Sequence, residues 1–517
     1  MTCAEPPGIC AEYERDTRAI ADSSARLLGP EATAGDLDGV HAARLAGGGL
    51  VRLYRAPSGL ATLFYRADAC GLGDTGGVLA PLGRGRIDRQ GLLEYLRFGD
   101  IVAPRTIAAG VRAVEPGHRV TVGAGAPRSE ALAWGDEERP KSFEDAVARL
   151  DRLLSASVRQ RLLGAGRPAA FLSGGVDSAL LCAVAARTRP DLVAVTVGFD
   201  GEGFDETPVA ARIATHLGLR HEVLRFSREA LVGALERVAR ESDQPSADPS
   251  TPATLLAFEH CRARYDAVLD GSGADEALGA VPPRHVRLAA GVFSQLPRGL
   301  RLAIAGLSRR AGRLAAYRPL VDFDHPADTM LRWRCFTRAE IESLVSGPVS
   351  FEDSAYYRRF AALRHGDLEG CYSALQDLMP LDRVSQALRA TGVPLRLPFY
   401  DPRVQALLRD LPKAWRHQPG DSKRVLRALL EREVPRVLWD QPKHGFNFPL
   451  EDFLRGADAA LVREHLGPSR WAAYGLLEPD GVQHLARRFL EGDSALTFRV
   501  WSLVVLGSWL DQHPELR

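Results

Sequence analysis

The chain lacks the features that mark disulfide-rich, zinc-binding and membrane-spanning proteins. Its 517 residues include seven cysteines, an odd number with neither a CxxC pair nor a zinc-ligand spacing, which favours free thiols in a reducing compartment. No apolar run approaches the ~18 residues that a membrane helix needs, and the first residues do not have the basic and apolar parts of a signal peptide. We therefore expect a cytoplasmic protein without a membrane partner.

An excess of one charge is also missing. Lys and Arg number 66 against 65 Asp and Glu, so the formal net charge is +1. This balance argues against a nucleic-acid partner, because nucleic-acid-binding proteins usually carry a clear basic excess. Hydrophobic residues make up 45% and charged residues 25%, the usual proportions of a globular protein. At roughly 100–200 residues per domain, the length predicts two to four domains.

Two regions with different patterns follow one another along the chain. Residues 1–135 contain short β-like runs separated by Gly and Pro, which predicts a small β-rich domain. The polar, Pro-bearing stretch 125–142 is the best candidate for a linker. Residues 143–517 form the second predicted domain, in which helices first alternate with short apolar strands. After about residue 285 the strand signals fade and the pattern is mostly helical.

Strand–helix alternation predicts an α/β fold with a parallel, doubly wound sheet and a mostly helical C-terminal part. The expected order is helix 143–163, strand and loop 168–175, helix 176–188, strand 191–199, helix 206–219, strand 220–226, and a strand with a Gly-rich loop over 265–273. The apolar stretch from Trp501 is too short to cross a membrane and predicts a buried core helix.

The strongest chemical signal is the string SGGVDS at residues 173–178, which follows an apolar strand and opens a helix. Backbone N–H groups at a helix N-terminus bind anions, and glycines let a phosphate approach closely. Asp177 can hold Mg²⁺, which prefers oxygen ligands. The string is not a GxxxxGK[ST] Walker loop. The alternative interpretation is an ordinary Gly-rich turn with a serine cap.

This string resembles the PP-loop of ATP pyrophosphatases, which cleave ATP between the α- and β-phosphates. Further strings follow in the order found in asparagine synthetases: FDE at 204–206, His221-Glu222, DGSGADE at 270–276, LRLPFYDPRV, SKRVLR and QPKHGFNFPL. The match covers residues 143–517 well and 89–122 more faintly. The chain is therefore similar to the asparagine synthetase family, which includes β-lactam synthetases and lasso-peptide macrolactam cyclases.

The resemblance implies ATP and Mg²⁺ as cofactors and assigns a role to each matching position. The residues that would cradle the pyrophosphate are Ser173, Gly174, Gly175 and Ser178, with Gly271 and Gly273 in the second loop. Those that would hold adenine are Leu172 and the strand end containing Val197 and Gly198. Asp177 and Asp275 would bind Mg²⁺ on the pyrophosphate. For Asp205, Glu206 and His221, helix capping and structural hydrogen bonds are the alternative to a functional role.

Lysine is scarce, with only four residues among 66 basic ones: Lys141, Lys413, Lys423 and Lys443. Two of them fall on family positions, and a compact ammonium suits a phosphate site differently from a guanidinium. The resemblance implies that Lys423 neutralises phosphate charge and that Lys443 stabilises the transition states of adenylation and amidation. A solvated surface charge is the alternative at both positions.

The N-terminal region departs from the family pattern. Glutamine-hydrolysing members carry an N-terminal nucleophilic cysteine, whereas position 2 here is Thr2, and the only asparagine, Asn447, lies far from where an Asn-Gly pair would stabilise the oxyanion. Residues 1–135 are therefore predicted to be a shortened glutaminase-like domain without glutaminase activity.

The second loop and the carboxylate site also differ. Ser272 stands where asparagine synthetases have Glu, and a serine hydroxyl is too weak a base to deprotonate an ammonium. Asp243 and Asp270 are the candidate bases, unless the amine arrives neutral. Arg396 is kept from the family's Glu-x-Arg pattern, but Pro394 replaces the Glu, which puts aspartate as the substrate in doubt.

The sequence thus predicts an ATP-dependent ligase that adenylates a carboxylate and couples it to an amine, in specialised-metabolite or peptide biosynthesis. Ring closure of the macrolactam or β-lactam type is favoured, with a small molecule or peptide as substrate and a precursor peptide and a processing protease as candidate partners. An ammonia-dependent, asparagine synthetase-like amidotransferase is the alternative. An RNA-modifying PP-loop enzyme and a non-catalytic nucleotide-binding protein are further alternatives.

Overall fold

The structure is a computed structural model. It describes residues 40–44, 51–56, 60, 62–66, 85–123, 125–132, 138–198, 205–279, 284–308, 323, 336–361, 382–418, 421–440 and 448–516. Thr2, Lys443 and Asn447 lie outside these residues, so their predicted roles stay predictions.

The N-terminal region contains an antiparallel sheet with the strand order β1-β2-β5-β6 and a separate strand pair, β3 with β4. The strands are β1 (Val40–Arg44), β2 (Val51–Arg55), β3 (Phe64–Arg66), β4 (Val111–Ala113), β5 (His118–Gly123) and β6 (Gly125–Ala131). The linker prediction for residues 125–142 is wrong in its first part, because β6 pairs with β5 there. Nearly every residue of β6 is exposed. An exposed edge strand has no apolar face, so its polar composition resembles that of a linker.

The second region is built on a parallel sheet of five strands in the order β11-β10-β7-β8-β9. These strands are β7 (Pro168–Phe171), β8 (Val193–Gly198), β9 (Arg220–Arg225), β10 (Ala267–Leu269) and β11 (Leu395–Arg396). The predicted parallel, doubly wound fold is confirmed. The order reverses between β7 and β10, and ligands of such sheets bind at the carboxyl ends of the strands beside this switch point.

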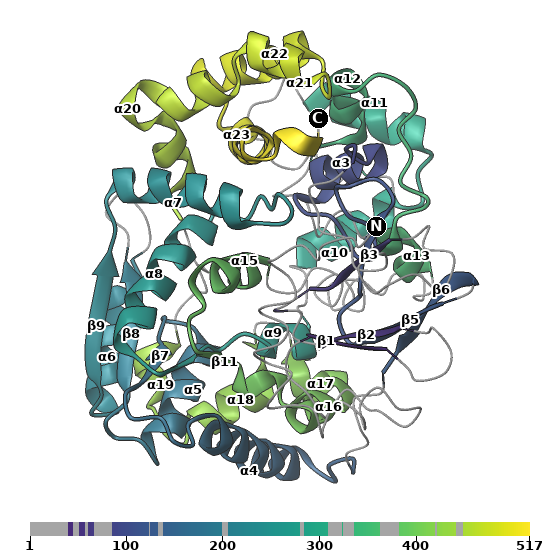
Figure 1. The fold of residues 1–517 in the computed structure, drawn as a ribbon. Helices are drawn as coiled ribbons and strands as arrows, with labels where there is room; N and C mark the ends of the chain where they lie inside the picture. The colour runs from purple at the N-terminus through teal and green to yellow at the C-terminus, as the bar shows by residue number, and fades with distance from the viewer. Residues whose placement is uncertain are drawn as a thin grey trace, which may run out of the picture.

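Both faces of the sheet are covered by helices. Ala170 and Leu269 share a core with α4 (Phe143–Arg161), α5 (Val176–Ala186), α6 (Thr207–His216), α16 (Pro402–Asp410) and α18 (Arg424–Leu430). Ala169 and Val268 share another with α7 (Arg228–Glu241), α8 (Thr251–Arg264) and α15 (Asp382–Thr391). In Figure 1, α8 and α15 lie above the sheet and α4, α5 and α18 below it.

A third core joins helix α3 of the N-terminal region to the C-terminal helices. Helix α3 (Arg89–Phe98) packs with α12 (Arg338–Leu344), α20 (Leu450–His465), α21 (Pro468–Tyr474), α22 (Pro479–Leu490) and α23 (Thr497–Gln512), and these helices gather at the top of Figure 1. The stretch from Trp501 is buried inside α23, as predicted. The predicted division at residues 135–143 stays a prediction, but α3 belongs to this shared core.

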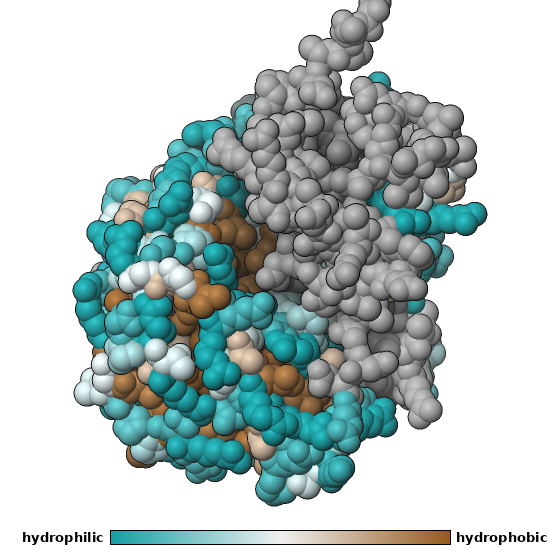
Figure 2. All heavy atoms as spheres, turned by 60° about the horizontal axis from the view of Figure 1, so that its bottom comes forward, coloured by the Kyte–Doolittle hydropathy of each residue, from teal (hydrophilic) through white to brown (hydrophobic). Residues whose placement is uncertain are grey.

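The remaining described helices are α9 (Ala274–Leu278), α10 (Arg284–Phe293), α11 (Arg298–Ser308), α13 (Ala355–Ala361), α17 (Lys413–Arg416) and α19 (Arg436–Trp439), and β12 (His417–Gln418) pairs with β13 (Asp421–Ser422). Among the helices that the structure describes, none is both long and apolar enough to span a bilayer. On the face shown in Figure 2, hydrophilic side chains cover much of the described surface and alternate with hydrophobic patches.

Candidate functional site

The loop between β7 and α5 is held in shape by its own two serines. The Ser173 N–H donates to Ser178 Oγ at 3.0 Å, and the Gly175 N–H donates to Ser173 Oγ at 3.1 Å. Ser178 Oγ lies 2.9 Å from Ser173 Oγ and 3.2 Å from the Gly175 carbonyl oxygen. These bonds fold the chain back over the first turn of α5, so the loop lies at a helix N-terminus, the position that favours anions.

The loop after β10 lies directly against this first loop. A Cβ atom placed on Gly271 would come 3.1 Å from Ser178 N and 3.3 Å from Asp177 C, which leaves little room for a side chain. Gly273 has φ +106, and a Cβ there would come 2.7 Å from Tyr400 Cδ2. Gly271 therefore lets the loops of the neighbouring strands β7 and β10 meet at the switch point, and Gly273 lets the second loop pack against Tyr400.

Three predicted residues from distant parts of the chain form one ionic cluster. Lys423 Nζ is paired with Asp177 Oδ2 and lies 2.6 Å from Asp275 Oδ1. Asp177 lies in the first turn of α5, Asp275 in α9, and Lys423 caps α18, which packs against α5. The Lys423 side chain is 7% exposed, whereas Asp177 and Asp275 are 20% and 33% exposed. The cation is thus buried behind two carboxylates that water can reach.

The electrostatics of this cluster favour a charged lysine. Burial alone would lower the pKa of Lys423, but the carboxylates of Asp177 and Asp275 outweigh it and raise the pKa above its ordinary value. Lys423 also has a left-handed backbone with φ 57, which is uncommon for a residue with a side chain. Such backbone conformations cost free energy and persist where the surrounding structure holds them.

The two carboxylates suit a magnesium ion. One oxygen of each, Asp177 Oδ2 and Asp275 Oδ1, contacts the Lys423 ammonium, so the two carboxylates lie close together and each has a second oxygen that is not the one facing Lys423. Among the described residues no group of three or more His, Cys, Asp or Glu could hold a metal. Mg²⁺ commonly takes one or two carboxylates and completes its shell with phosphate oxygens and water. The residues therefore fit Mg²⁺ bound together with a phosphate group.

The predicted adenine positions lie at the carboxyl ends of β7 and β8. The Leu172 N–H donates to the Val195 carbonyl at 2.8 Å, and Thr196 Oγ1 donates to the Leu172 carbonyl at 2.6 Å. Val197 and Gly198 end β8, and a Cβ on Gly198 would come 2.8 Å from Thr207 Cγ2 of α6. The backbone of Leu172 is thus engaged in the sheet, and nothing in these contacts tests adenine binding.

Asp205, Glu206 and His221, which lie on strings that resemble the family, have different hydrogen-bond partners. Asp205 caps α6, since it accepts from the Thr207 N–H at 3.0 Å and from Arg225 at 3.0 Å. Glu206 accepts instead from the Gly174 N–H of the loop at residues 173–178, at 3.3 Å. His221 Nε2 lies 2.8 Å from Thr196 Oγ1, and burial lowers its pKa.

The candidate bases are engaged with other groups. Asp270 accepts from the Ser272 N–H at 2.8 Å and from the Ser272 hydroxyl, so it shapes the second loop. Asp243 is paired with Arg389 of α15. Arg396 lies on β11, whose backbone carbonyl accepts from the Asp270 N–H at 3.0 Å. The structure brings Asp270 and Ser272 to the site beside Asp275.

Two residues that the sequence analysis did not single out support the second loop from inside. Glu276 accepts from the Gly273 N–H at 2.8 Å, and burial, followed by the charge of Asp275, raises its pKa to about 7. Gln405 Nε2 donates to the carbonyls of Gly273 and Phe399, at 2.8 Å each. Glu276 stands within the acidic string, but its burial cannot be read from sequence, and Gln405 lies 132 residues from Gly273.

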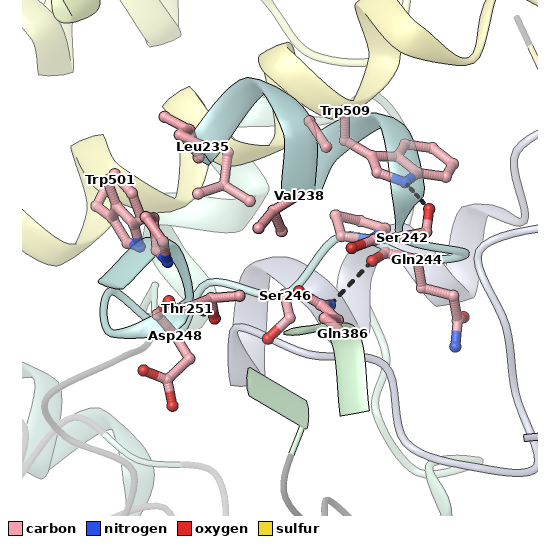
Figure 3. A pocket seen from close by; sticks show the side chains of 14 residues that line it. Leu235, Val238, Ser242, Gln244, Ser246, Asp248, Thr251, Gln386, Trp501 and Trp509 are labelled. Carbon is pink, nitrogen blue, oxygen red and sulfur yellow. Dashed lines mark hydrogen bonds between the residues drawn. The ribbon is translucent and has the colours of Figure 1, made fainter. Parts of the chain in front are cut away.

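A small pocket lies at the junction of α7, α8, α15 and α23 and is lined by none of the predicted site residues. Figure 3 shows Trp509 donating to the Ser242 carbonyl and Gln386 donating to the Gln244 carbonyl, at 3.0 and 3.3 Å. Trp501 Nε1 donates to the Ala247 carbonyl at 2.9 Å. The pocket marks the place where α15 and α23 hold the segment between α7 and α8.

Comparisons with known proteins agree with the predicted resemblance. The family model described as Asparagine synthase matches residues 149–511. A Mycobacterium tuberculosis protein named as a candidate glutamine-hydrolysing asparagine synthetase is 27% identical over 452 residues, which cover 82% of this chain and 67% of that protein. Asparagine synthetase [glutamine-hydrolyzing] 1 of Bacillus subtilis is 24% identical over 449 residues, which cover 83% and 70%.

Among solved structures, the NMN synthetase from Francisella tularensis aligns with 26% of this chain and 58% of its own, at 17% identity and a TM-score of 0.21. A score this low supports no conclusion, and the fold rests on the strand order and pairing described above.

Proposed function

Because the chain belongs to the asparagine synthase family, we propose that it is an ATP-dependent, AMP-forming amide ligase. It adenylates a substrate carboxylate, releases pyrophosphate and couples the acyl group to an amine. The observation that carries this proposal is the cluster of Asp177, Asp275 and Lys423 beside the loop at residues 173–178. A nucleoside triphosphate with its metal requires carboxylates for the metal and a cation and N–H groups for the phosphates. This site offers all of them at one switch point.

In the first step a substrate carboxylate oxygen attacks the α-phosphorus of ATP, and the bond to the β-phosphate oxygen breaks. N–H groups of the loop at 173–178 would donate to the leaving pyrophosphate and stabilise the negative charge that develops on it. Asp177 and Asp275 would hold Mg²⁺, which would neutralise phosphate charge when bound. Lys423, which contacts one oxygen of each carboxylate, supplies a second, fixed positive charge beside them.

In the second step the amine nitrogen attacks the carbonyl carbon of the acyl adenylate, and AMP leaves with the pair of electrons from the C–O bond. An ammonium must first lose a proton, and Ser272 is a poor base for this. Asp270 is the nearest carboxylate to Ser272 among the contacts of the second loop. We propose Lys443 as the residue that stabilises the charge of both transition states, following its family position.

We propose that the amine belongs to a specialised metabolite or a peptide, with ring closure to a macrolactam or β-lactam as the favoured outcome. Pro394, at the position of the Glu in the family's Glu-x-Arg pattern, supports this over asparagine synthesis. A precursor peptide and its processing protease would then be partners. Ammonia-dependent, asparagine synthetase-like amidation is the second candidate. The names of the relatives support the asparagine synthetase part of it, while they give glutamine hydrolysis for those proteins.

ATP–pyrophosphate exchange tests the first step without knowledge of the amine. Candidate carboxylates are screened with Mg²⁺, and Asp177→Ala is compared with Asp191→Ala, which removes a carboxylate paired with Arg189 on the surface. We expect carboxylate-dependent exchange that Asp177→Ala lowers at least about 100-fold, because electrostatic groups at a transition state are commonly worth this much. Equal exchange in the two variants would contradict the role of Asp177. Exchange with aspartate alone would favour the second candidate.

A further inference from the structure

The carboxylate of Glu206 is aimed at the phosphate loop rather than at its own helix. Glu206 is the N-cap residue of α6, yet its side chain makes no capping hydrogen bond there. Asp205 accepts from the Thr207 N–H and so performs the capping. Glu206 Oε2 instead accepts from the Gly174 N–H at 3.3 Å.

The packing around Gly174 keeps Glu206 in this place. A Cβ atom on Gly174 would come 3.3 Å from Val209 Cγ1 and 3.7 Å from Glu206 Cβ, so the first turn of α6 lies against the loop. Helices α5 and α6 both begin at the carboxyl edge of the sheet, after β7 and β8. Their N-termini carry partial positive charges that favour an anion between them.

We propose that Glu206 is an internal competitor for the phosphate loop. Its carboxylate accepts the Gly174 N–H that a phosphate oxygen of the substrate takes, and it thereby sets the affinity of the loop for anions. A carboxylate and a phosphate are both anionic acceptors, so one N–H group serves either but not both at full strength. This inference rests on the proposed function, because it requires that the loop at residues 173–178 bind phosphate.

Competition between Glu206 and a phosphate oxygen for the Gly174 N–H is useful in a loop that must release its product. Pyrophosphate leaves after each adenylation, and a tethered anion that returns to Gly174 speeds the release of a phosphate oxygen from it. Replacing Glu206 is therefore expected to tighten pyrophosphate binding. Removing one charge-assisted hydrogen bond that competes for the site should change the dissociation constant by about tenfold.

Binding of inorganic pyrophosphate in the presence of Mg²⁺, measured by isothermal titration calorimetry, tests this on the full chain. The variants are Glu206→Gln, which keeps the shape, and Glu206→Ala, which removes the acceptor. Asp205→Asn is the matched control, because it removes one negative charge from the neighbouring position without touching Gly174. Thermal unfolding of each variant establishes that it is folded.

We expect Glu206→Ala to bind pyrophosphate about tenfold more tightly than the unaltered chain. Glu206→Gln should gain less, because its amide oxygen still accepts from the Gly174 N–H although the charge is gone, and Asp205→Asn should bind as the unaltered chain does. Unchanged or weaker binding in both Glu206 variants would overturn the competition while leaving the phosphate loop in place. An equal gain in Asp205→Asn would show a general charge effect and would also overturn it. If the unaltered chain and all variants failed to bind, the phosphate loop itself, and with it the proposed function, would be wrong.

Discussion

At the scale of single residues, Lys423 makes the least replaceable contact in the site. It is the cation between Asp177 and Asp275, and its side chain is nearly closed to solvent. An arginine would not fit this place in the same way, because a guanidinium is a planar fork and an ammonium a compact charge. A chain that uses arginine for almost every cation keeps a lysine here.

We predict that Lys423→Met lowers the free energy of unfolding by about 3 kcal/mol, the lower end for breaking a buried ion pair, since solvent reaches the two carboxylates. Urea unfolding measures the change. Lys413→Met, at an exposed position of α17, is the control and should stay within about 0.5 kcal/mol of the unaltered chain. A loss no larger than that of the control would show that the ion cluster does not stabilise the fold.

Glu94 gives a pH dependence whose direction follows from its surroundings. Burial raises its pKa from 4.5 to about 7, although Arg105 acts in the opposite direction. The folded chain therefore binds this proton more tightly than the unfolded chain, and stability is lost as pH rises from about 4.5 through 7. Glu94→Gln should remove this loss, so its stability relative to the unaltered chain should rise between pH 5 and pH 8. Unfolding curves at both pH values measure it, and a constant difference would contradict the prediction.

At this scale the sequence singled out residues that the structure brings together where they are close along the chain, and their roles stay predictions. The loop at 173–178 and the acidic string after β10 were identified by their order of residue types. The sequence did not show that Glu206 contacts Gly174 or that Gln405 supports Gly273, because both contacts depend on how helices pack. Asp205 caps α6 and Glu206 contacts the loop because the two side chains point to different partners, and this direction is set by the packing of α6.

At the scale of elements, α23 fixes the segment between α7 and α8 through two indoles. Trp501 and Trp509 donate to the carbonyls of Ala247 and Ser242. We predict that Trp509→Phe costs about 1–3 kcal/mol, because it leaves a buried carbonyl without its donor. Chemical denaturation measures this, with Trp471→Phe as the comparison, since that indole bonds to His465 among the C-terminal helices.

If Trp509→Phe acts on the junction, protease cleavage between α7 and α8 should also become faster in it, and not in Trp471→Phe. Equal cleavage of the two variants would show that the indole of Trp509 supports α23 alone.

The elements themselves were predictable to different degrees. Helix α4 and strands β7, β8 and β9 were identified because their apolar spacing or apolar runs are long enough to be read. Strand β11 was missed, since two residues carry no period and its pairing with β10 is set by the sheet. Strand β6 was assigned to a linker because an exposed edge strand has no apolar face.

At the scale of the whole molecule, helix α3 of the N-terminal region shares one hydrophobic core with the C-terminal helices. Tyr95 Oη donates to the Ser502 carbonyl at 2.7 Å, and the Phe336 N–H donates to the Leu96 carbonyl at 3.1 Å. Leu92, Leu93 and Leu96 are almost fully buried in the core that holds Trp501. The core that contains Trp501 therefore extends beyond the residues matched by the family model, 149–511.

We predict that a chain beginning at residue 138 aggregates, because it exposes the apolar surface that α3 covers, whereas the full chain stays dispersed. Size-exclusion chromatography and binding of a hydrophobic dye measure the difference. A monodisperse product from residue 138 onward, with cooperative unfolding, would show that α3 is dispensable.

The pairing of Lys423 with Asp177 joins residues 246 positions apart. A ribosome adds roughly 5–20 residues per second, so the phosphate loop exists for many seconds before its cation is synthesised. Through that interval the first turn of α5 carries a carboxylate with no ammonium to meet it. Strand β10 waits roughly half as long for β11, because Leu395 follows its partner Val268 more closely along the chain. The nascent chain therefore acquires its binding site only near the end of translation, when α18 docks on α5.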